Sequence, residues 1–354
     1  MAHCDIDAFY ASAELLRRPD LRGVPLIVGG LGPRSVVTTA SYEARAFGVD
    51  SAMPMSRARS LCPQAVVLPP DMARYREISQ QVWGMMRDRF PVLQQAGIDE
   101  AYVDLTDVDK PLTSMREAVA AVEAETGMFI SVGVGPNRLV AKTTSGAAKP
   151  RGFATLSREQ ACEAFAGASV RKLQGIGPRT AERLGELGIL TIGDLQRRTP
   201  EELTAKVGTG SGPRLHALAH FIDESAVQVE RAIKSCSRET TFPEDIADAG
   251  RLLAVLDGLA EQLSQDLERK GLAGRTVGIK VRFADWTTKT RAVSVDRATR
   301  DPAAIRSLAR TLFEREQIDA PVRLLGVRSA GFEEPAETER RRPRHDEAQL
   351  PLPL

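Results

Sequence analysis

The amino-acid sequence predicts an α+β protein of several domains, in which helices pack on one face of mixed or antiparallel sheets. The first observation is length, because 354 residues exceed the size of one typical domain. The second is that short apolar runs typical of strands alternate with helical periodicity up to about residue 156 and again after residue 231. The third is that strand signals vanish between residues 157 and 225, where short helices punctuated by glycine are expected.

The first 156 residues combine short strands with one long amphipathic helix. Apolar residues recur roughly at helical spacing in "RYREISQQVWGMMRDRF", which predicts a helix that packs on a sheet through Tyr75, Ile78, Val82, Met85 and Phe90. Strands are expected where apolar and β-branched residues cluster, at the start of the chain and at residues 25–30, 34–41, 65–70, 101–107, 128–135 and 152–157.

The rest of the chain divides into a small all-helical unit, a second α/β domain and a tail. The helical unit contains "GIGPRTAERLGELGI" and ends near Ser225. The second α/β domain begins near Arg231. Its expected strands lie at residues 275–285, 287–299 and 323–332, and its two expected helices at residues 249–271 and 301–317. The last 22 residues are polar and contain proline, which predicts a disordered tail.

The composition argues against a membrane protein and against a disulfide-stapled scaffold. Hydrophobic residues make up 42% of the chain, yet no segment approaches the roughly 18 unbroken apolar residues that a membrane helix needs. The start "MAHCDID" lacks the basic and apolar regions of a signal peptide, so we expect a soluble, cytoplasmic protein. The cysteines form no C-x-x-C pair, which disfavours a zinc ribbon, and we expect reduced thiols at Cys4, Cys62, Cys162 and Cys236.

Two acidic pairs are candidate metal ligands. Asp5 and Asp7 point to the same face if the strand at the start of the chain runs through both. In "GIDEAYVDLTD", Asp99 and Glu100 are adjacent, and both can face one metal only if a turn falls there, which Gly97 favours. Oxygen ligands without clustered His or Cys suit Mg²⁺ or Mn²⁺. A solvated strand end is the more common origin of each pair taken alone.

Phosphate-binding candidates lie in the same part of the chain. Tyr42 and Arg45 are one helical turn apart, so a hydroxyl and a guanidinium can share one face. Lys142 and Lys149 follow a predicted strand and the turn at "GPN". Surface lysines on a solvated helix are the alternative, but together with the acids these residues supply metal ligands and neutralisers for a triphosphate.

Two further segments have the chemistry of nucleic-acid contacts. Gly175 and Gly177 precede a helix that should begin near Pro178, so backbone N–H groups can bind a phosphate without reading a base. The pattern through a second glycine turn is similar to a helix-hairpin-helix unit, although a G-x-G turn can also be a simple connector. Residues 271–300 contain seven Lys or Arg and only two acids, which indicates either a phosphate-binding sheet or a solvated basic face.

From about His3 to Phe332 the chain resembles the Y family of translesion DNA polymerases. The motifs occur in the family's order, before and after the hairpin helices: "DIDAFYASAE", "SYEARAFGV", "SAMPMSRA", "IDEAYVD", "SVGVGPNRLVAK", "AAKPRG" and "KSCSRETTF". The resemblance implies a right-hand polymerase with a palm at 1–10 and 75–156, fingers at 11–74, a helical thumb at 157–230 and a C-terminal α/β little finger at 231–333. It also implies low fidelity, tolerance of damaged templates and poor processivity.

The resemblance further implies a catalytic site with two Mg²⁺ ions. Asp5, Asp99 and Glu100 would be the catalytic metal ligands, assisted by the backbone carbonyl of Ile6, while Asp7 would have a supporting role. The incoming deoxynucleoside triphosphate would be bound by Tyr42, Arg45 and Lys149. Tyr10 would be the steric gate, whose ring would clash with a ribose 2′-hydroxyl, although Tyr10 can equally be a core aromatic.

The implied partners are primer–template DNA, deoxynucleoside triphosphates and the replication sliding clamp, and the chain is expected to be a monomer. The DNA contacts would come from Gly175, Gly177, Lys280, Arg282, Lys289, Arg291 and Arg297. The C-terminal "QLPLPL" is similar to a sliding-clamp peptide at the end of a flexible tail (residues 334–354), with Gln349, Leu350, Leu352 and Leu354 as its contacts.

Two other functions compete with template-directed synthesis. A non-catalytic repair adaptor of the same fold would bind DNA and the clamp, but we expect an adaptor to lose the acidic set that is present here. A metal-dependent nuclease can also combine paired carboxylates with a helix-hairpin-helix. The triphosphate-binding set and the "YEAR" and "AKP" motifs favour nucleotide addition.

Overall fold

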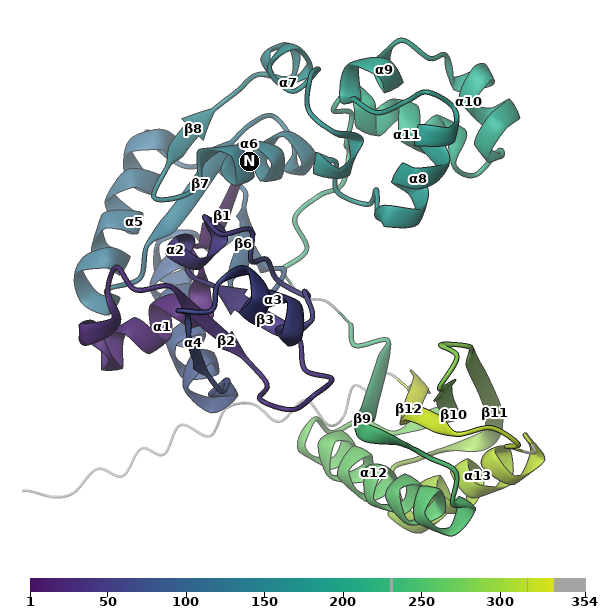
Figure 1. The fold of residues 1–354 in the computed structure, drawn as a ribbon. Coiled ribbons are helices and arrows are strands. Elements are labelled where there is room, and N and C mark those ends of the chain that lie inside the picture. Colours follow the sequence, from purple (N-terminus) through teal and green to yellow (C-terminus); the bar gives the residue numbers. More distant parts are fainter. Residues whose placement is uncertain (230–231, 317, 334–354) are drawn as a thin grey trace, which may run out of the picture. The chain divides into compact units, whose positions relative to one another are not determined.

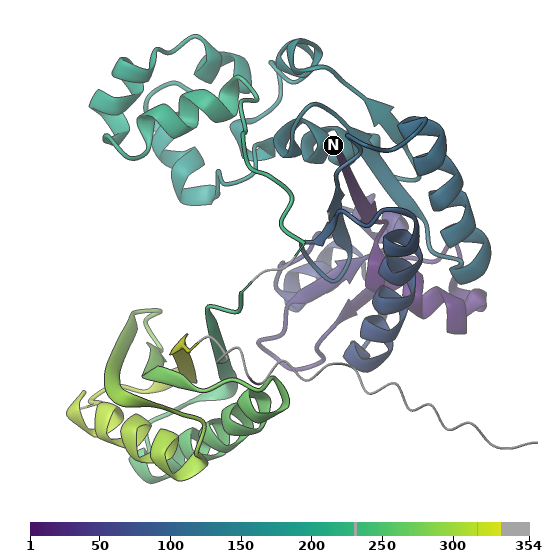
Figure 2. The same ribbon diagram turned by 180° about the vertical axis from the view of Figure 1, so that it is seen from behind.

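The computed structural model describes residues 1–229, 232–316 and 318–333, and the chain divides into two compact units at residues 231/232 (Figure 1; Figure 2). The predicted tail and its clamp peptide lie outside the described residues. No helix in the described ranges combines the length and apolar character needed to cross a bilayer. The α+β fold class is confirmed, and the predicted cytoplasmic location stays a prediction.

The first unit is built around a mixed five-stranded sheet of order β5-β6-β1-β7-β8. The central strand β1 pairs antiparallel with β6 on one side and with β7 on the other. β8 is parallel to β7. The strands are β1 Ala2–Ile6, β5 Leu93–Gln95, β6 Glu100–Val103, β7 Ile130–Val134 and β8 Phe153–Thr155.

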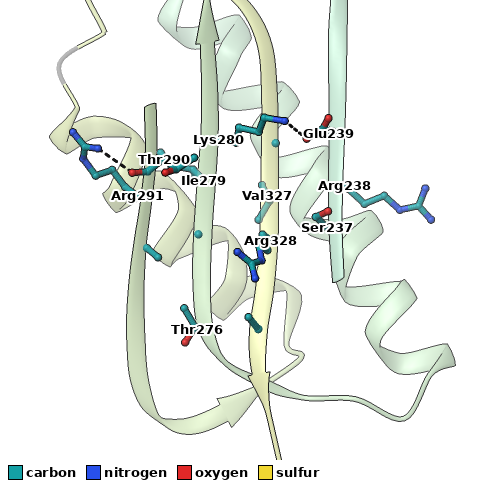
Figure 3. Close-up of a pocket in the computed structure, with 14 residues that line it drawn as sticks. Ser237, Arg238, Glu239, Thr276, Ile279, Lys280, Thr290, Arg291, Val327 and Arg328 are labelled. Carbon is teal, nitrogen blue, oxygen red and sulfur yellow. Dashed lines mark hydrogen bonds and ion pairs between the residues drawn. The ribbon is translucent and has the colours of Figure 1, made fainter. Parts of the chain in front are cut away.

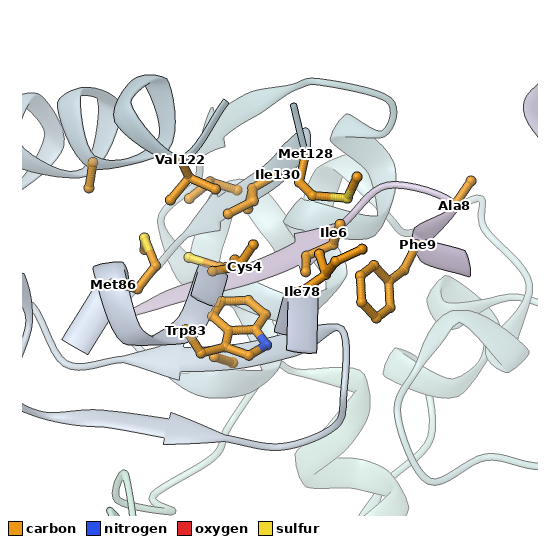
Figure 4. Close-up of a cluster of buried hydrophobic side chains, with 14 of the residues drawn as sticks. Cys4, Ile6, Ala8, Phe9, Ile78, Trp83, Met86, Val122, Met128 and Ile130 are labelled. Carbon is orange, nitrogen blue, oxygen red and sulfur yellow. The ribbon is translucent and has the colours of Figure 1, made fainter. Parts of the chain in front are cut away.

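Helices cover both faces of this sheet, not one face as the sequence suggested. On β1, the Cys4 thiol lies against Met115 of α5, whereas the His3 ring bonds Ser145 of α6. Because successive strand residues point to opposite faces, α5 and α6 lie on opposite faces of the sheet. Figure 4 shows Trp83 and Met86 of α4 packed on the same side as Cys4. The helices are α1 Phe9–Arg17, α4 Met72–Arg89, α5 Pro111–Thr126 and α6 Arg138–Ala148.

The predicted long helix is α4, and its buried residues follow the predicted period. Tyr75, Ile78 and Val82 are buried in the core of the five-stranded sheet, and Phe90 is buried just beyond the end of the helix. The side chain of Asp71 caps the helix by accepting the Arg74 N–H. Helical periodicity therefore located both the helix and the face that it buries.

A smaller three-stranded sheet of order β3-β2-β4 lies within the same unit. β2 pairs antiparallel with β3 and parallel with β4, and two short helices pack on the sheet through a separate apolar core. The elements are β2 Leu26–Gly29, β3 Val37–Ala40, β4 Val66–Leu68, α2 Tyr42–Arg45 and α3 Met55–Leu61.

The predicted all-helical segment consists of five short α-helices and a 3₁₀ turn at Val170–Lys172, and its apolar core also includes Leu139 and Val140 of α6. Ser157, Thr191 and Thr199 each form a capping box at a helix start, which satisfies backbone N–H groups that short helices otherwise expose. The helices are α7 Arg158–Ala164, α8 Pro178–Glu186, α9 Ile192–Gln196, α10 Pro200–Val207 and α11 Gly212–Ala219.

The second unit is a four-stranded antiparallel sheet of order β11-β10-β12-β9, with two helices on one face. Along β10, Val277, Ile279, Val281 and Phe283 are buried against the helices, while the residues between them lie on the other face. The elements are β9 Ser235–Ile246, α12 Ala249–Arg269, β10 Gly274–Phe283, β11 Thr288–Thr299, α13 Pro302–Arg315 and β12 Val322–Phe332.

Candidate active site

The pairing of β1 with β6 brings the two predicted acidic motifs together. Asp5 lies directly opposite Glu100 in the register, although 95 positions separate them along the chain. The backbone N–H of Ile6 donates to the carbonyl of Asp99 at 2.8 Å, which holds the residue before β6 against the end of β1. Three acidic residues from two motifs therefore lie at one end of the central strand pair.

The bend that precedes β6 is fixed from two sides. The N–H groups of Ala96 and Gly97 donate to the carbonyl of Glu100 at 3.0 and 3.2 Å, so the chain reverses where Gly97 predicted a turn. The carbonyl of Ile98 accepts the Ser79 hydroxyl at 2.5 Å and the indole N–H of Trp83 at 3.0 Å. α4 therefore holds the residue immediately before Asp99 with two hydrogen bonds.

α6 crosses close to the other face of the sheet because Gly133 of β7 has no side chain. A Cβ at Gly133 would overlap the backbone of Ala141 and Ser145 in α6. The close approach lets Ser145 Oγ bond His3 Nδ1 at 2.7 Å, and it places Lys142 Nζ 3.3 Å from His3 Nε2. Sequence reasoning found Lys142 but not the roles of His3, Gly133 or Ser145, since these depend on packing between elements.

Lysine side chains neutralise two of the three carboxylates. Lys149 forms an ion pair with Asp5, and Lys142 forms one with Glu100. Burial raises the pKa of Asp5, against the lowering effect of Lys149, and burial also raises the pKa of Asp99. Asp5 and Asp99 are therefore carboxylates whose charge is costly until a cation offsets it.

Glu100 has the opposite electrostatic environment. Its Oε2 lies 3.4 Å from His3 Nε2 and contacts the Lys142 ammonium group. Contact with His3 and with Lys142 lowers the pKa of Glu100 to about 2, against the effect of burial. Burial lowers the pKa of His3 itself. Glu100 is thus held ionised, as a ligand for a cation must be.

The carboxylate set fits a hard divalent cation by its chemistry. Among the described residues, no three His, Cys, Asp or Glu side chains are grouped closely enough to share a metal ion as they stand. Asp5, Asp99 and Glu100 nevertheless offer oxygen donors alone, which Mg²⁺ and Mn²⁺ prefer. Two of these carboxylates already hold an ammonium group, so positive charge is stabilised at this end of the sheet.

Asp7 has a structural environment distinct from that of Asp5. β1 ends at Ile6, so strand alternation does not extend to Asp7, which is buried. Its carboxylate accepts the Ser131 hydroxyl at 2.9 Å, the Tyr42 hydroxyl at 3.1 Å and the Arg151 N–H at 2.7 Å. These bonds tie three separate segments to the end of β1, and the supporting role expected for Asp7 stays a prediction.

The predicted nucleotide-binding residues come from α1, α2 and the segment after α6. Tyr42 and Arg45 of α2 are stacked, with the guanidinium 5.0 Å from the ring centroid, so they do share one face of the short helix. The Nε of Arg45 donates to the carbonyl of Ala40 at 3.0 Å. Tyr10 lies on α1 and is half-buried against the core. Tyr42, through Asp7, and Lys149, through Asp5, are the two that bond to residues at the end of β1.

The predicted phosphate-binding turn leads into α8. Gly175 has a φ of +93°, which favours glycine, and Gly177 is the N-cap residue with Pro178 at the first helical position. The first N–H groups of a helix have no partner within the helix. Arg214 of α11 lies so close to Gly175 that a Cβ there would overlap its guanidinium. This arginine, which the sequence did not single out, adds a positive charge beside the turn.

The predicted DNA-binding cations of the second unit do not share one face. Lys280 and Arg282 are on the face of β10 without helices, and Lys280 pairs with Glu239 at 2.9 Å (Figure 3). Lys289 and Arg291 are paired in register with the buried residues Val281 and Ile279, so they point to the helix-bearing face, where both pair with Glu316. The strand register therefore places these four cations on two opposite faces of the sheet. Arg297 is exposed farther along β11.

A depression on the helix-free face has a floor of small residues around one arginine. Gly278 of β10 pairs with Arg328 of β12 on one side and with Ala292 of β11 on the other, and Arg328 also pairs with Ser237 of β9. These residues line a hollow of the sheet surface in which Arg328 is exposed (Figure 3). Sequence reasoning missed Arg328, although "VRSAGF" alternates as a half-buried strand should.

Comparison with known proteins assigns the family. Residues 4–146 match the model of the impB/mucB/samB family, and residues 233–342 match the model of its C-terminal domain. A DNA polymerase IV from Methanoculleus marisnigri is 41% identical over 338 residues, which cover 94% of this chain and 94% of that protein. The chain belongs to the Y family of DNA polymerases.

Other relatives of this Y-family chain agree. A DNA polymerase IV from Streptomyces coelicolor is 39% identical over 336 residues, covering 93% of this chain and 70% of that protein. A solved Y-family DNA polymerase chimera superimposes with a TM-score of 0.82 and 24% identity, covering 94% of this chain and 98% of its own, and it confirms the fold. The shared name of the curated relatives supports DNA-directed DNA polymerase activity for this chain.

Proposed function

We propose that this Y-family polymerase carries out error-prone translesion synthesis, adding deoxynucleotides to a primer 3′-hydroxyl by two-metal phosphoryl transfer. The observation that supports the proposal most strongly is the β1–β6 register. It sets Asp5 opposite Glu100, and the Ile6 N–H bonds the Asp99 carbonyl. Three half-buried carboxylates at one strand end, two of them paired with lysines, have the chemistry of a divalent-cation site.

In the proposed mechanism, Asp5, Asp99, Glu100 and the Ile6 carbonyl would hold two Mg²⁺ ions. When bound, the two ions lower the barrier for attack of the 3′-hydroxyl on the α-phosphate and offset charge on the departing pyrophosphate. Glu100, with its lowered pKa, is ready to bind a cation at neutral pH, whereas Asp5 and Asp99, with raised pKa values, ionise most readily when positive charge lies beside them.

In this proposal Lys149 would change partners, whereas Lys142 would not. With a divalent cation bound at Asp5, Lys149 would be free to neutralise the triphosphate together with Tyr42 and Arg45. Lys142 remains tied to His3 by a contact of 3.3 Å, so it stays near Glu100. In either state the Asp5 carboxylate would have a cation beside it, which avoids an unpaired buried charge.

The proposed domain roles follow the family. We assign residues 1–10 and 75–156 to the palm, 11–74 to the fingers, 157–230 to the thumb and 231–333 to the little finger. The Gly175–Gly177 turn would bind a DNA phosphate, and the helix-free sheet face with Lys280 and Arg282 would contact the duplex, with an affinity that falls steeply as salt rises. The terminal "QLPLPL" would bind the sliding clamp and raise the polymerase concentration near the primer end.

Primer extension tests the proposal. Purified protein should extend a primer with Mg²⁺ and deoxynucleotides, and Asp99→Ala or Glu100→Ala should abolish extension. Asp107→Ala removes an exposed acid a few residues after β6, so this control variant should extend the primer normally. Absent extension by the wild type, with DNA binding retained, would favour the non-catalytic adaptor. Undiminished extension by both active-site variants would defeat the catalytic assignment.

A further inference from the structure

Glu14 is a buried carboxylate that the proposed mechanism does not use. It ends the motif "DIDAFYASAE", lies on α1 and is only 4% exposed. Its Oε1 accepts the Tyr75 hydroxyl at 2.7 Å, and both of its oxygens accept the Arg17 guanidinium, at 2.8 and 3.0 Å. A buried carboxylate is costly unless it is paired, so these bonds fix the position of Glu14 and of the hydroxyl that it binds.

The ring of Tyr75 stacks against that of Tyr10, the proposed sugar gate. Its ring lies parallel to that of Tyr10, with centroids 4.4 Å apart and 15° between the planes, and it is fully buried. Phe9 meets Tyr75 edge-on, with centroids 6.2 Å apart. One face of the Tyr10 ring is therefore covered by a ring that cannot yield without disturbing the core.

Tyr75 is held by hydrogen bonds at both its backbone and its hydroxyl. The Arg17 guanidinium that binds Glu14 also pairs with Asp71 at 3.2 Å, and the Asp71 carbonyl accepts the Tyr75 N–H at 3.0 Å. Burial and the contact with Glu14 raise the pKa of Tyr75, so the hydroxyl keeps its proton and remains a donor. The ring is thus held at its backbone and at its hydroxyl, by α1 and by the start of α4.

We propose that Tyr75 and Glu14 are positioning residues for sugar selection, because they hold the Tyr10 ring in the one orientation that excludes a ribose 2′-hydroxyl. The inference rests on the proposed polymerase function and on the gate role of Tyr10. A steric gate discriminates between the two sugars only if its ring resists displacement by the 2′-hydroxyl. A ring stacked on a fixed neighbour is harder to tilt than a ring beside a mobile one. Tyr75 and Glu14 need not touch the nucleotide for this effect.

The test compares the kcat/KM ratio for a deoxynucleotide and its ribonucleotide in single-nucleotide primer extension. Tyr75→Leu removes the stack, and since such aromatic pairs are worth roughly three- to tenfold in an equilibrium, discrimination should fall by about that factor. Tyr75→Phe keeps the ring and Glu14→Ala removes the acceptor, so each should lower discrimination by about threefold or less. The double variant Tyr75→Phe/Glu14→Ala should match Glu14→Ala, because the bond that Tyr75→Phe removes is already broken in Glu14→Ala.

Two variants serve as controls. Glu14→Gln keeps an oxygen that accepts the Tyr75 hydroxyl and should preserve discrimination. Glu77→Ala removes an exposed acid from the same helix as Tyr75 and should also leave the ratio unchanged. General loss of stability lowers both rates together and does not move the ratio, so the ratio separates positioning from a merely structural role.

The outcomes separate this inference from the functions on which it rests. Discrimination that falls in Tyr10→Ala, Tyr75→Leu and Glu14→Ala supports it. Discrimination that falls in Tyr10→Ala alone overturns it. An unchanged ratio in Tyr10→Ala overturns both the gate and the positioning roles, while normal extension with deoxynucleotides in the same assay still supports the polymerase function.

Discussion

Gly133 is the position where one added methyl group should separate α6 from the sheet. A Cβ there would overlap the Ala141 carbonyl oxygen and the Ser145 backbone nitrogen, and backbone atoms cannot move aside as the end of a flexible side chain can. Overpacking of a tight site costs about 1–3 kcal/mol, and we expect Gly133→Ala to lie near the upper end. The shift should also draw Ser145 and Lys142 away from His3, and so weaken primer extension.

Gly146 provides a matched substitution on α6 itself. It is exposed, and an added Cβ would meet nothing within 4 Å, so Gly146→Ala should stabilise the helix by up to about 1 kcal/mol. For a unit of this size, 1 kcal/mol shifts Tm by about 2–4 °C, so Gly133→Ala should lower Tm by about 6–12 °C while Gly146→Ala raises it slightly. Thermal unfolding followed by far-UV circular dichroism checks both. A Gly133→Ala protein as stable as the wild type would refute the close-approach argument.

The remaining predictions concern the bend before β6 and the charges it carries. Ser79→Ala and Trp83→Phe each leave the Ile98 carbonyl one donor. Ser79→Ala should cost about 1 kcal/mol in urea unfolding, and Trp83→Phe should cost more because Trp83 is fully buried and the smaller ring leaves a cavity. The double variant should cost more than their sum because a half-buried carbonyl then loses both donors. Simple additivity would contradict this. In metal-free protein at pH 7, Glu100→Gln should lower Tm and Asp99→Asn should raise it, since the pKa of Glu100 is lowered and that of Asp99 is raised. The stability that ionised Glu100 contributes is present above its ordinary pKa of 4.5 and is lost as pH falls toward about 2. The difference in Tm between wild type and Glu100→Gln should therefore close on acidification. A gap that is constant with pH would count against that pairing.

The approach of the two acidic motifs was largely predictable because Asp5 and Glu100 lie on short, strongly patterned strands and Asp99 directly precedes one of them, while their role as metal ligands stays a prediction. "HCDID" and "IDEAYVD" each carry acids beside strand-forming residues, and Gly97 marks the bend that lets Asp99 and Glu100 lie at one strand end. Helical periodicity likewise located α4, and glycine turns marked the helical segment. These signals are local in sequence, so a single chain is enough to see them.

The parts that were missed depend on how elements pack. Ser145 meets His3 only because Gly133 admits α6, and no sequence period records which face of a sheet a helix will cover. The wrong expectation of helices on one face has the same origin. The backing of Tyr10 by Tyr75 joins α1 to α4, and only the folded core shows it.

The cations of the second unit show a different limit. Lys289 and Arg291 share a face by alternation, as do Lys280 and Arg282, but the relation between the two pairs depends on the register across the β10–β11 hairpin. Lys280 lies opposite Thr290, so the two pairs fall on opposite faces. Composition alone shows these residues as one basic stretch. A register that differed by one residue would have placed both pairs of cations on the same face.

The most direct test of the central claim is single-turnover nucleotide incorporation by Asp5→Asn. The substitution removes one carboxylate of the β1–β6 site and keeps its shape. Primer–template affinity, measured by fluorescence anisotropy, should match the wild type, while incorporation should fall by at least about a hundredfold, since even outer partners of metal ligands are commonly worth ten- to a hundredfold. Incorporation within about tenfold of the wild type at equal DNA occupancy would contradict Asp5 as a ligand on that same scale.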